Sequence, residues 1–353
     1  MDRKDRIQAF VKTIWQWYAM HKRELPWRDL PDSDPADRAY KVLVSEIMLQ
    51  QTQVSRVKIV FKDFLERLPH IQALAQATNR EVLLAWRGMG YNGRALRLRD
   101  AAKSIVDRLQ VASCKAANTN LQLATCNSSF FPPSMDELRS IPGIGPYTAA
   151  AIRNFAFNIP TPCIDTNIRR ILHRTFVGSE NADGTWKKDD DYLLQLVGEI
   201  LDVAVTSSGE KRDAANWHAA LMDFGSIIQT KRNPKWEECP LTAKKLMKTT
   251  QASYERRAKS YELSLKLTAQ SSKLEPGRFV GSRYIPNRIF RGKVIEELRD
   301  AGAGLSLETI GKRVCIDWSP RIHRAWLREI TEKLVRERML QVEKGRYRLF
   351  EGM

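Results

Sequence analysis

The chain has 353 residues, enough for two or three domains, and 43% of them are hydrophobic, so buried cores can form. No apolar run reaches the length of a membrane span and 28% of the residues are charged, which excludes a membrane protein. The formal charge of +17 favours a polyanion such as nucleic acid as the partner, with a basic protein of another kind as the alternative.

Helical periodicity dominates the first 250 residues. In the first helix, apolar residues from Ile7 to Tyr18 recur at i, i+3, i+4 and i+7, which puts them on one face. No convincing run of alternating strands occurs, so this region is predicted to be all α-helical. Further helices are predicted over residues 40–51, 57–68, 81–87, 94–109, 147–157, 166–176, 192–205 and 214–228.

Three stretches interrupt the helical pattern. Residues 110–131 are rich in Ala, Asn, Ser and Thr without a clear period, and are predicted to form a loop insertion of unknown role. Residues 177–191 contain glycines and three consecutive aspartates, which is again typical of a loop. Residues 249–276 are polar and charged, and are expected to form a connecting helix or a linker.

The C-terminal part of the sequence has a different pattern. Apolar and polar residues alternate on both sides of Glu343-Lys-Gly345, which predicts a β-hairpin. Three short helices are predicted before it, over residues 292–301, 306–314 and 320–339. Three helices followed by a hairpin is the order of a winged-helix domain, which can contact DNA or dock a protein. We expect Arg321 and Arg324, at the start of the third helix, to contact DNA.

The segment Ile141-Pro-Gly-Ile-Gly-Pro-Tyr147 is the strongest local signal. Gly143 and Gly145 directly precede a helix, and glycine lets the backbone turn sharply and approach a phosphate. The helix start, which includes Thr148, offers unpaired N–H groups and a partial positive charge. We therefore predict a hairpin between two helices that grips DNA backbone without reading bases, with an ordinary Gly-rich turn as the alternative.

Two carboxylates stand in positions suited to acid–base chemistry. Glu46 lies in an otherwise apolar helix, where burial is expected to raise the pKa of the carboxyl and make it a general acid, although a surface glutamate is the alternative. Asp165 directly precedes a helix, whose dipole favours an ionised carboxylate that can stabilise a developing sugar cation. Taken alone, Asp165 is more simply interpreted as an N-cap.

Five segments together resemble the adenine DNA glycosylases of the helix–hairpin–helix superfamily, the MutY type: Pro26–Arg28, Ser45–Thr52, Gly88–Tyr91, Ile141–Thr148 and Ile164–Arg170. The resemblance covers about residues 5 to 245, in order and with compatible spacing. The string from Glu46 to Thr52 is rather specific to the adenine enzymes, whereas the hairpin and Asp165 are shared across the superfamily.

The resemblance implies an all-α, two-lobed helix–hairpin–helix glycosylase fold, to which the C-terminal winged-helix (α+β) domain is added. The N-terminal helix, within residues 1–35, is expected to complete a helical domain formed by residues 156–250. Residues 36–155 are expected to form a six-helix domain that contains the hairpin. Residues 251–275 are then a linker, and residues 276–353 form the winged-helix-like domain.

The resemblance also implies a mechanism. In the family, a glutamate matching Glu46 protonates N7 of a flipped adenine, the glycosidic bond breaks through an oxocarbenium-like sugar, and an aspartate matching Asp165 stabilises that cation. Tyr147 and Asn167 match residues close to the sugar. Because bifunctional relatives carry a Schiff-base lysine where Tyr147 stands, we expect a monofunctional enzyme without significant strand cleavage.

Further site residues are implied by the same resemblance. Gln51 and Tyr91 match residues that wedge into the duplex beside the lesion pair. His218 falls where relatives often have glutamine or glutamate near the base, with a structural histidine as an equal alternative. The wall of the adenine pocket, which selects the flipped base by stacking and hydrogen bonds, is matched by Arg23, Leu25, Trp27 and Arg28.

The sequence departs from the family where most members bind a 4Fe–4S cluster through C-x6-C-x2-C-x5-C. In that register the chain has Gln229, Trp236, Cys239 and Lys245, and one thiolate cannot hold a cluster. We therefore expect a cluster-free enzyme in which Trp236 fills part of the space by packing. We expect no cofactor and no metal, apart from a monovalent cation that the hairpin of relatives often holds through backbone carbonyls.

The expected partner is double-stranded DNA that contains a mispaired adenine, bound by a monomer. The opposite base, 8-oxoguanine or G, stays open, because residues 271–353 lack the Phe-Ser-His loop with which many members inspect 8-oxoguanine. An odd number of scattered cysteines and a polar N-terminus indicate an intracellular, DNA-associated protein, in the cytoplasm, nucleoid or nucleus. The alternatives are a mismatch thymine or uracil glycosylase and a non-catalytic lesion-binding protein.

Overall fold

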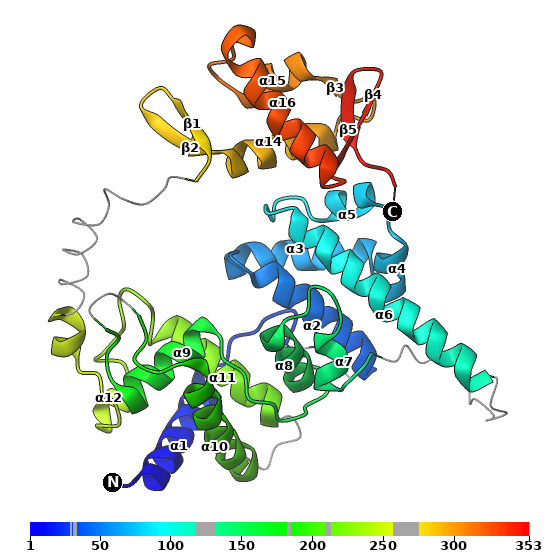
Figure 1. Ribbon diagram of the computed structural model, residues 1–353. Coiled ribbons are helices and arrows are strands. Elements are labelled where there is room, and N and C mark those ends of the chain that lie inside the picture. The colour runs from blue at the N-terminus through cyan, green and yellow to red at the C-terminus, as the bar shows by residue number, and fades with distance from the viewer. Residues whose placement is uncertain are drawn as a thin grey trace. The chain divides into compact units, whose positions relative to one another are not determined.

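A computed structural model of the chain describes residues 1–28, 30, 34–117, 131–181, 185–208, 213–256 and 275–352 (Figure 1). The chain divides into two compact units. The first comprises Met1–Val42, Pro132–Ser140 and Ile144–Ser272, and the second comprises Leu43–Phe131, Ile141–Gly143 and Lys273–Met353. The domain boundaries predicted from the sequence stay predictions.

The first unit is built around three long helices that pack on one another, α1, α10 and α11. The side chain of Asp2 caps α1 by accepting a hydrogen bond from the N–H of Asp5 at 2.7 Å, and the predicted apolar face of α1 is buried. Phe10 on α1 meets Trp217 on α11 edge to face, with ring centroids 6.2 Å apart. The helices of this unit are α1 (Arg3–His21), α7 (Met135–Arg139), α8 (Pro146–Phe155), α9 (Thr166–Leu172), the π-helix η1 (His173–Val177), α10 (Asp190–Ser208), α11 (Asp213–Ile227) and α12 (Pro240–Ala243).

The second unit contains most of the remaining helices of the first 250 residues. Phe64 and Trp86 meet edge to face at 5.9 Å in its core, and α4 packs along α6. The side chains of Thr78 and Glu81 form a capping box that starts α5. Its helices are α2 (Pro35–Leu49), which begins in the first unit, α3 (Val54–Arg67), α4 (Ile71–Gln76), α5 (Asn79–Ala85) and α6 (Gly93–Ala117).

The predicted helices are confirmed, but the loop predicted from residue 110 is wrong at its start. Helix α6 continues to Ala117, since alanine favours a helix even where no apolar face shows in the sequence. Residues 118–130 of the predicted insertion lie outside the described residues. Of the predicted linker, residues 251–256 are helical and residues 257–274 lie outside the described residues. In the part of the chain that the structure describes, no helix is long and apolar enough to cross a membrane.

Residues 275–352 form the C-terminal domain, which has the predicted order of helices and hairpin. Strands β1 and β2 form an antiparallel hairpin that the sequence did not reveal, and a second sheet has the order β3-β5-β4. Leu305 and Val342 both pair with Tyr347, which places β5 in the middle of that sheet. The elements are β1 (Gly277–Val280), β2 (Arg283–Pro286), α14 (Asn287–Arg299), β3 (Leu305–Ser306), α15 (Leu307–Val314), α16 (Pro320–Arg336), β4 (Leu340–Glu343) and β5 (Arg346–Leu349).

Candidate active site

Asp165 is the N-cap of α9, and both of its carboxylate oxygens accept hydrogen bonds. The N–H of Ile168 donates to Oδ1 at 2.6 Å, and Nδ2 of Asn167 donates to Oδ2 at 3.0 Å. Burial raises the pKa of Asp165, while these hydrogen bonds and the charge of Arg170 oppose that rise. The pKa of Asp165 is therefore raised overall, whereas a helix start alone would lower it. The sequence does not reveal how deeply the carboxyl is enclosed, so this direction could not be predicted.

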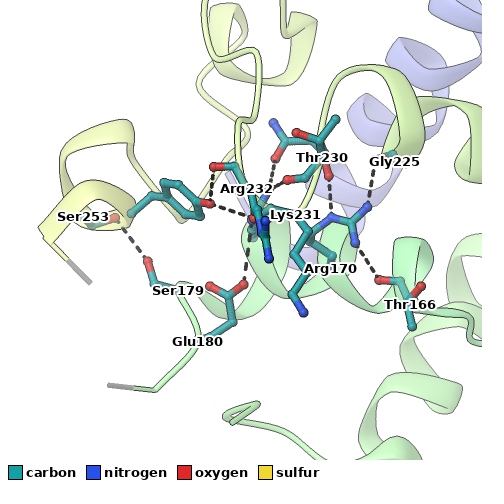
Figure 2. A network of polar contacts seen from close by, with 12 residues as sticks. Thr166, Arg170, Ser179, Glu180, Gly225, Thr230, Lys231, Arg232 and Ser253 are labelled. Atoms are coloured by element: carbon teal, nitrogen blue, oxygen red, sulfur yellow. Dashed lines mark hydrogen bonds and ion pairs between the residues drawn. The ribbon is translucent and has the colours of Figure 1, made fainter. Parts of the chain in front are cut away.

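Arg170, one turn along α9, holds Asn167 in the orientation that reaches Asp165. Its Nη2 donates to Oδ1 of Asn167 and, at 2.8 Å, to the carbonyl oxygen of Gly225 on α11. Its Nη1 donates to the carbonyl oxygen of Thr166 at 3.2 Å, and the arginine is almost fully buried. The contacts of Arg170 with Thr166 and Gly225 can be followed in Figure 2. The carboxylate is thus fixed by a relay of side chains, which suits a group that must meet a developing charge.

The Gly-rich segment turns where the sequence predicts it. Gly143 has φ +90°, a conformation that favours glycine, and Gly145 is the N-cap of α8 with open space around its missing side chain. The side chain of Thr148 is buried, so its N–H in the first turn of α8 is the group that can reach a phosphate. Tyr147 is half-buried and packs against the core of the first unit.

Glu46 lies in the part of α2 that belongs to the second unit, and Asp165 belongs to the first. The residue is only 8% exposed, so its burial is as the sequence predicts. Its neighbours along α2 include Val44, Ile47 and Met48, all of them buried. The helix therefore carries a buried carboxyl, and acidic side chains are seldom buried in proteins unless they are paired.

Arg94, which the sequence analysis missed, joins the two turns that carry the predicted wedge residues. Its Nη1 donates to the carbonyl oxygen of Ile47 at 3.0 Å, and its Nη2 donates to that of Met89 at 3.2 Å. Gln51 has φ +55° and Tyr91 has φ +45°, so both are left-handed although neither is glycine. Strained backbone of this kind clusters at functional sites, although Asn158, Lys245, Arg338 and Lys344 share the left-handed conformation.

The predicted pocket-wall residues lie together near the end of α1. Arg23 and Arg28 both direct their guanidinium groups to Asp223, a fully buried carboxylate on α11. Nε of Arg23 and Nη1 of Arg28 lie 2.7 and 2.8 Å from Oδ1 of Asp223. Leu25 and Trp27, between the two arginines, are buried. The structure therefore gives both arginines a carboxylate partner that the sequence analysis missed.

His218 is fully buried in α11, and its Nδ1 donates to the carbonyl oxygen of Ala214 at 2.8 Å. Burial lowers its pKa from 6.5 to about 4, so the ring is neutral near pH 7. A fully enclosed ring fits the structural histidine better than a residue that meets a flipped base.

Two of the four positions that would bind a 4Fe–4S cluster in relatives, Gln229 and Cys239, contact each other directly. Nε2 of Gln229 donates to Sγ of Cys239 at 3.3 Å, and Trp236 packs on Tyr254 with ring centroids 5.7 Å apart. Among the described residues, no group of three or more His, Cys, Asp or Glu side chains could hold a metal ion. The donor set at these positions therefore does not fit the cluster.

Arg174, fully buried on η1, holds the loop that follows α11. Its Nη1 donates to Oε1 of Gln229 at 3.1 Å and to the carbonyl oxygen of Thr230 at 2.9 Å. Its guanidinium also lies 4.8 Å from the centre of the Tyr254 ring, and the hydroxyl of Tyr254 hydrogen-bonds the carbonyl oxygens of Lys231 and Arg232. An ion pair at 3.8 Å connects the same guanidinium to Glu180.

The last predicted DNA contacts, Arg321 and Arg324, lie exposed on α16 in the C-terminal domain. Within the first unit, the structure thus brings Asp165 into contact with Asn167. In the same unit, it separately brings Arg23 and Arg28 to Asp223. Arg170 could have been found from the sequence, because it stands one helical turn after Asn167. Asp223 could not, because 200 positions separate it from Arg23.

Two curated relatives carry the same name. The adenine DNA glycosylase of Mycolicibacterium smegmatis is 35% identical over 229 residues, which cover 65% of this chain and 66% of that protein. The adenine DNA glycosylase of Mus musculus is 33% identical over 237 residues, which cover 67% of this chain and 41% of that protein. The matched region therefore spans less than two thirds of either relative.

Solved structures are similar in fold. A thermostable thymine-DNA glycosylase superposes with a TM-score of 0.54 at 24% identity, covering 71% of this chain and 98% of that chain. Endonuclease III, trapped as a covalent intermediate with DNA, superposes with a TM-score of 0.50 at 18% identity, covering 73% of this chain and 100% of that chain. These similarities confirm the predicted glycosylase fold, and the C-terminal domain has the predicted winged-helix-like order of elements.

A family model supports the same conclusion. It is described as HhH-GPD superfamily base excision DNA repair protein, and it matches residues 44–189. The match includes Glu46, the Gly-rich hairpin and Asp165. Residues 44–189 of the chain therefore match the HhH-GPD superfamily of base excision DNA repair proteins.

Proposed function

We propose that the chain is a monofunctional DNA glycosylase that removes adenine mispaired with 8-oxoguanine or guanine from duplex DNA, as a step of base excision repair. The observation that carries this proposal is the pair of carboxylates, a buried Glu46 and an Asp165 held by Asn167 and Ile168. Similarity to adenine DNA glycosylases over 65% and 67% of the chain supports adenine as the base.

In the proposed reaction, Glu46 donates its proton to N7 of the flipped adenine. The bond between C1′ and N9 then breaks, its electron pair leaves with the base, and the sugar becomes an oxocarbenium-like cation. Asp165 stabilises this cation, since Ile168 and Asn167 fix both of its oxygens in place. Water adds to C1′ and gives a proton to the Glu46 carboxylate, which restores the acid and leaves an abasic site and free adenine.

The proposed absence of strand cleavage depends on Tyr147. A β-lyase step needs an amine that attacks C1′ and forms a Schiff base, and a tyrosine hydroxyl cannot do so. The proposal therefore predicts that strands break at the abasic site only after alkali treatment. Efficient nicking together with a borohydride-trapped adduct would contradict this part of the proposal.

Contacts with DNA are proposed for both units. The N–H groups around Gly143, Gly145 and Thr148 bind backbone phosphates, and Gln51 and Tyr91 wedge into the base stack. Arg321 and Arg324 on α16 add charge that favours DNA. We further propose that the protein acts as a monomer, inside the cell and associated with DNA.

We also propose that no 4Fe–4S cluster is present. Cys239 is the one thiolate in the ligand register, and its sulfur accepts a hydrogen bond from Gln229. Trp236, Tyr254 and Arg174 pack around the same loop, which gives it a support built of side chains. Iron analysis of purified protein tests this point, and a stoichiometric iron content would contradict it.

The test of the activity uses duplexes that carry A, T or U opposite G or 8-oxoguanine. Alkali treatment after incubation should cleave only the strand that carries A, and Glu46→Gln should abolish cleavage while leaving DNA binding intact. Release of T or U without release of A would favour a mismatch thymine or uracil glycosylase. Binding without any base release would favour a non-catalytic lesion-binding protein.

A further inference from the structure

The C-terminal domain is packed on the helical part of the second unit through buried polar contacts. Asn79, which begins α5 and is buried, donates from its side chain to the carbonyl oxygen of Arg338. Its backbone N–H donates to the carbonyl oxygen of Gly352 at 3.1 Å. Arg299 on α14, also buried, donates to Oδ1 of Asn92 at 3.1 Å. Buried polar groups that satisfy one another in this way fix a domain in place, because separation would leave them unpaired.

This packing brings α14 to the turn that carries Tyr91. The side chain of Arg288, in the first turn of α14, is 47% exposed, and its Nη1 donates to the hydroxyl oxygen of Tyr91 at 3.1 Å. Its Nε donates to Oε2 of Glu275 at 3.0 Å, so the guanidinium is held at two points. The guanidinium of Arg94 lies 5.5 Å from the centre of the Tyr91 ring. The ring and the hydroxyl of one 48% exposed tyrosine are therefore both in contact with arginines.

A basic cavity of roughly 520 Å³ adjoins this contact. Tyr91, Arg97, Arg288 and Arg291 are among the residues that line it, and Glu337 pairs with Arg291. An excess of positive charge beside an exposed aromatic side chain is the combination that proteins use to follow a nucleic-acid backbone and stack on its bases. The surroundings of Tyr91 therefore fit a DNA strand better than an apolar partner.

We propose that Arg288 is a positioning residue for Tyr91, through which the C-terminal domain controls how Tyr91 enters duplex DNA beside the extruded base. The proposal rests on the proposed function, in which Tyr91 acts as a wedge. The hydrogen bond from Arg288 restricts rotation of the tyrosine side chain before DNA arrives, so less conformational entropy is lost on insertion. Because the tyrosine oxygen accepts this bond, its own proton stays available to a phosphate or a base.

The experiment uses the full chain and a duplex in which 2-aminopurine, a fluorescent adenine analogue that stacking quenches, stands opposite 8-oxoguanine. The variants are Arg288→Ala, Tyr91→Phe and the double variant. Arg313→Ala is the matched control, because Arg313 is an exposed arginine of the same domain that pairs with Glu297 at 3.4 Å. The measured quantity is the rise in fluorescence at saturating protein, and binding is measured separately by anisotropy.

Arg288→Ala and Tyr91→Phe should each lower the fluorescence rise by about three- to tenfold, as expected for the loss of one partly exposed hydrogen bond of ordinary strength. The double variant should lose no more than either single variant, because both changes remove the same bond. Arg313→Ala should retain the full rise. Multiplicative losses in the double variant, equal behaviour of Arg288→Ala and Arg313→Ala, or no rise with the wild-type protein would overturn the proposal.

The same measurement separates this inference from the proposed function. Fluorescence of 2-aminopurine reports unstacking whether or not a glycosidic bond is cut. If the wild-type protein unstacks the base but releases no adenine, the proposed activity fails and the role of Arg288 is still decided by the variants. If adenine is released but the variants behave independently, only the role of Arg288 fails.

Discussion

Gly225 on α11 faces Asn167 on α9 so closely that a methyl group on Gly225 would lie 2.6 Å from Cβ of Asn167. The carbonyl oxygen of Gly225 also accepts a hydrogen bond from Arg170, which in turn holds the side-chain oxygen of Asn167. Asn167 then donates to Asp165. Because Gly225 has no side chain, α9 can lie close to α11, and this close approach helps to fix the position of the proposed catalytic carboxylate of Asp165.

Gly225→Ala should therefore destabilise the protein by about 1–3 kcal/mol, the usual cost of forcing an extra methyl group into a packed interface. Adenine release should fall as well, because α9 must shift to make room. Urea unfolding measures the loss of stability, and single-turnover kinetics measure the release of adenine. Gly292→Ala is the control, since a methyl group on this helical glycine of α14 meets nothing within 4 Å. Equal behaviour of the two variants would contradict the proposed role of the close approach.

Asp165→Asn should change stability in a pH-dependent way. Burial raises the pKa of the folded-state carboxyl above its ordinary value of 3.8. The contribution of Asp165 is then present below 3.8 and is lost as the pH rises through the folded pKa. The free energy of unfolding of the wild type, relative to the variant, should therefore decrease as the pH rises from 3.8 through the raised folded-state pKa. Urea unfolding over this range measures the difference, and a difference that grows with pH would contradict the direction of the shift.

His218→Leu should make the protein less sensitive to acid. The folded-state pKa of about 4 lies below the ordinary 6.5, so between these values the unfolded chain takes up a proton that the folded chain does not. The wild type should lose stability as the pH falls through this window, by roughly 3 kcal/mol at most. Thermal unfolding at pH 7 and pH 4.5 should show a smaller drop for the variant. Equal drops for both proteins would argue against a buried neutral imidazole.

Asp223→Ala should be more damaging than the loss of an exposed ion pair. The change leaves Arg23 and Arg28 without the carboxylate to which both donate, and breaking a buried pair costs about 3–5 kcal/mol. Asp300→Ala removes an exposed partner of Arg87 and should cost about 1 kcal/mol or less. Denaturant unfolding compares the two variants. If Asp223→Ala proved as mild as Asp300→Ala, the convergence of the two arginines would have little importance for stability.

Periodicity predicted most of the helices because their apolar faces are long enough to repeat. The face of α1 from Ile7 to Tyr18 is buried as expected, whereas the six residues of α4 are too few to show a period. The hairpin of β1 and β2 was missed since its strands have four residues each and one ends at Pro286.

Local motifs revealed the position of the site better than its environment. The cap at Asp165 and the turn at Gly143 depend on neighbours in sequence, so they could be predicted. The carboxylate shared by Arg23 and Arg28, and the contact of Arg288 with Tyr91, join residues that are about 200 positions apart. A single sequence carries no signal for such pairs.

Side chains of Arg174 and Tyr254 support the loop from Gln229 to Tyr254. Iron–thiolate bonds are open to oxidants and chelators, whereas hydrogen bonds from Arg174 and Tyr254 to backbone carbonyls are not. On the proposal that no cluster is present, we expect a loop supported in this way to keep its geometry when iron is scarce or oxidative stress is high. Oxidative stress is also the condition under which guanine is oxidised fastest and its mispairs with adenine accumulate.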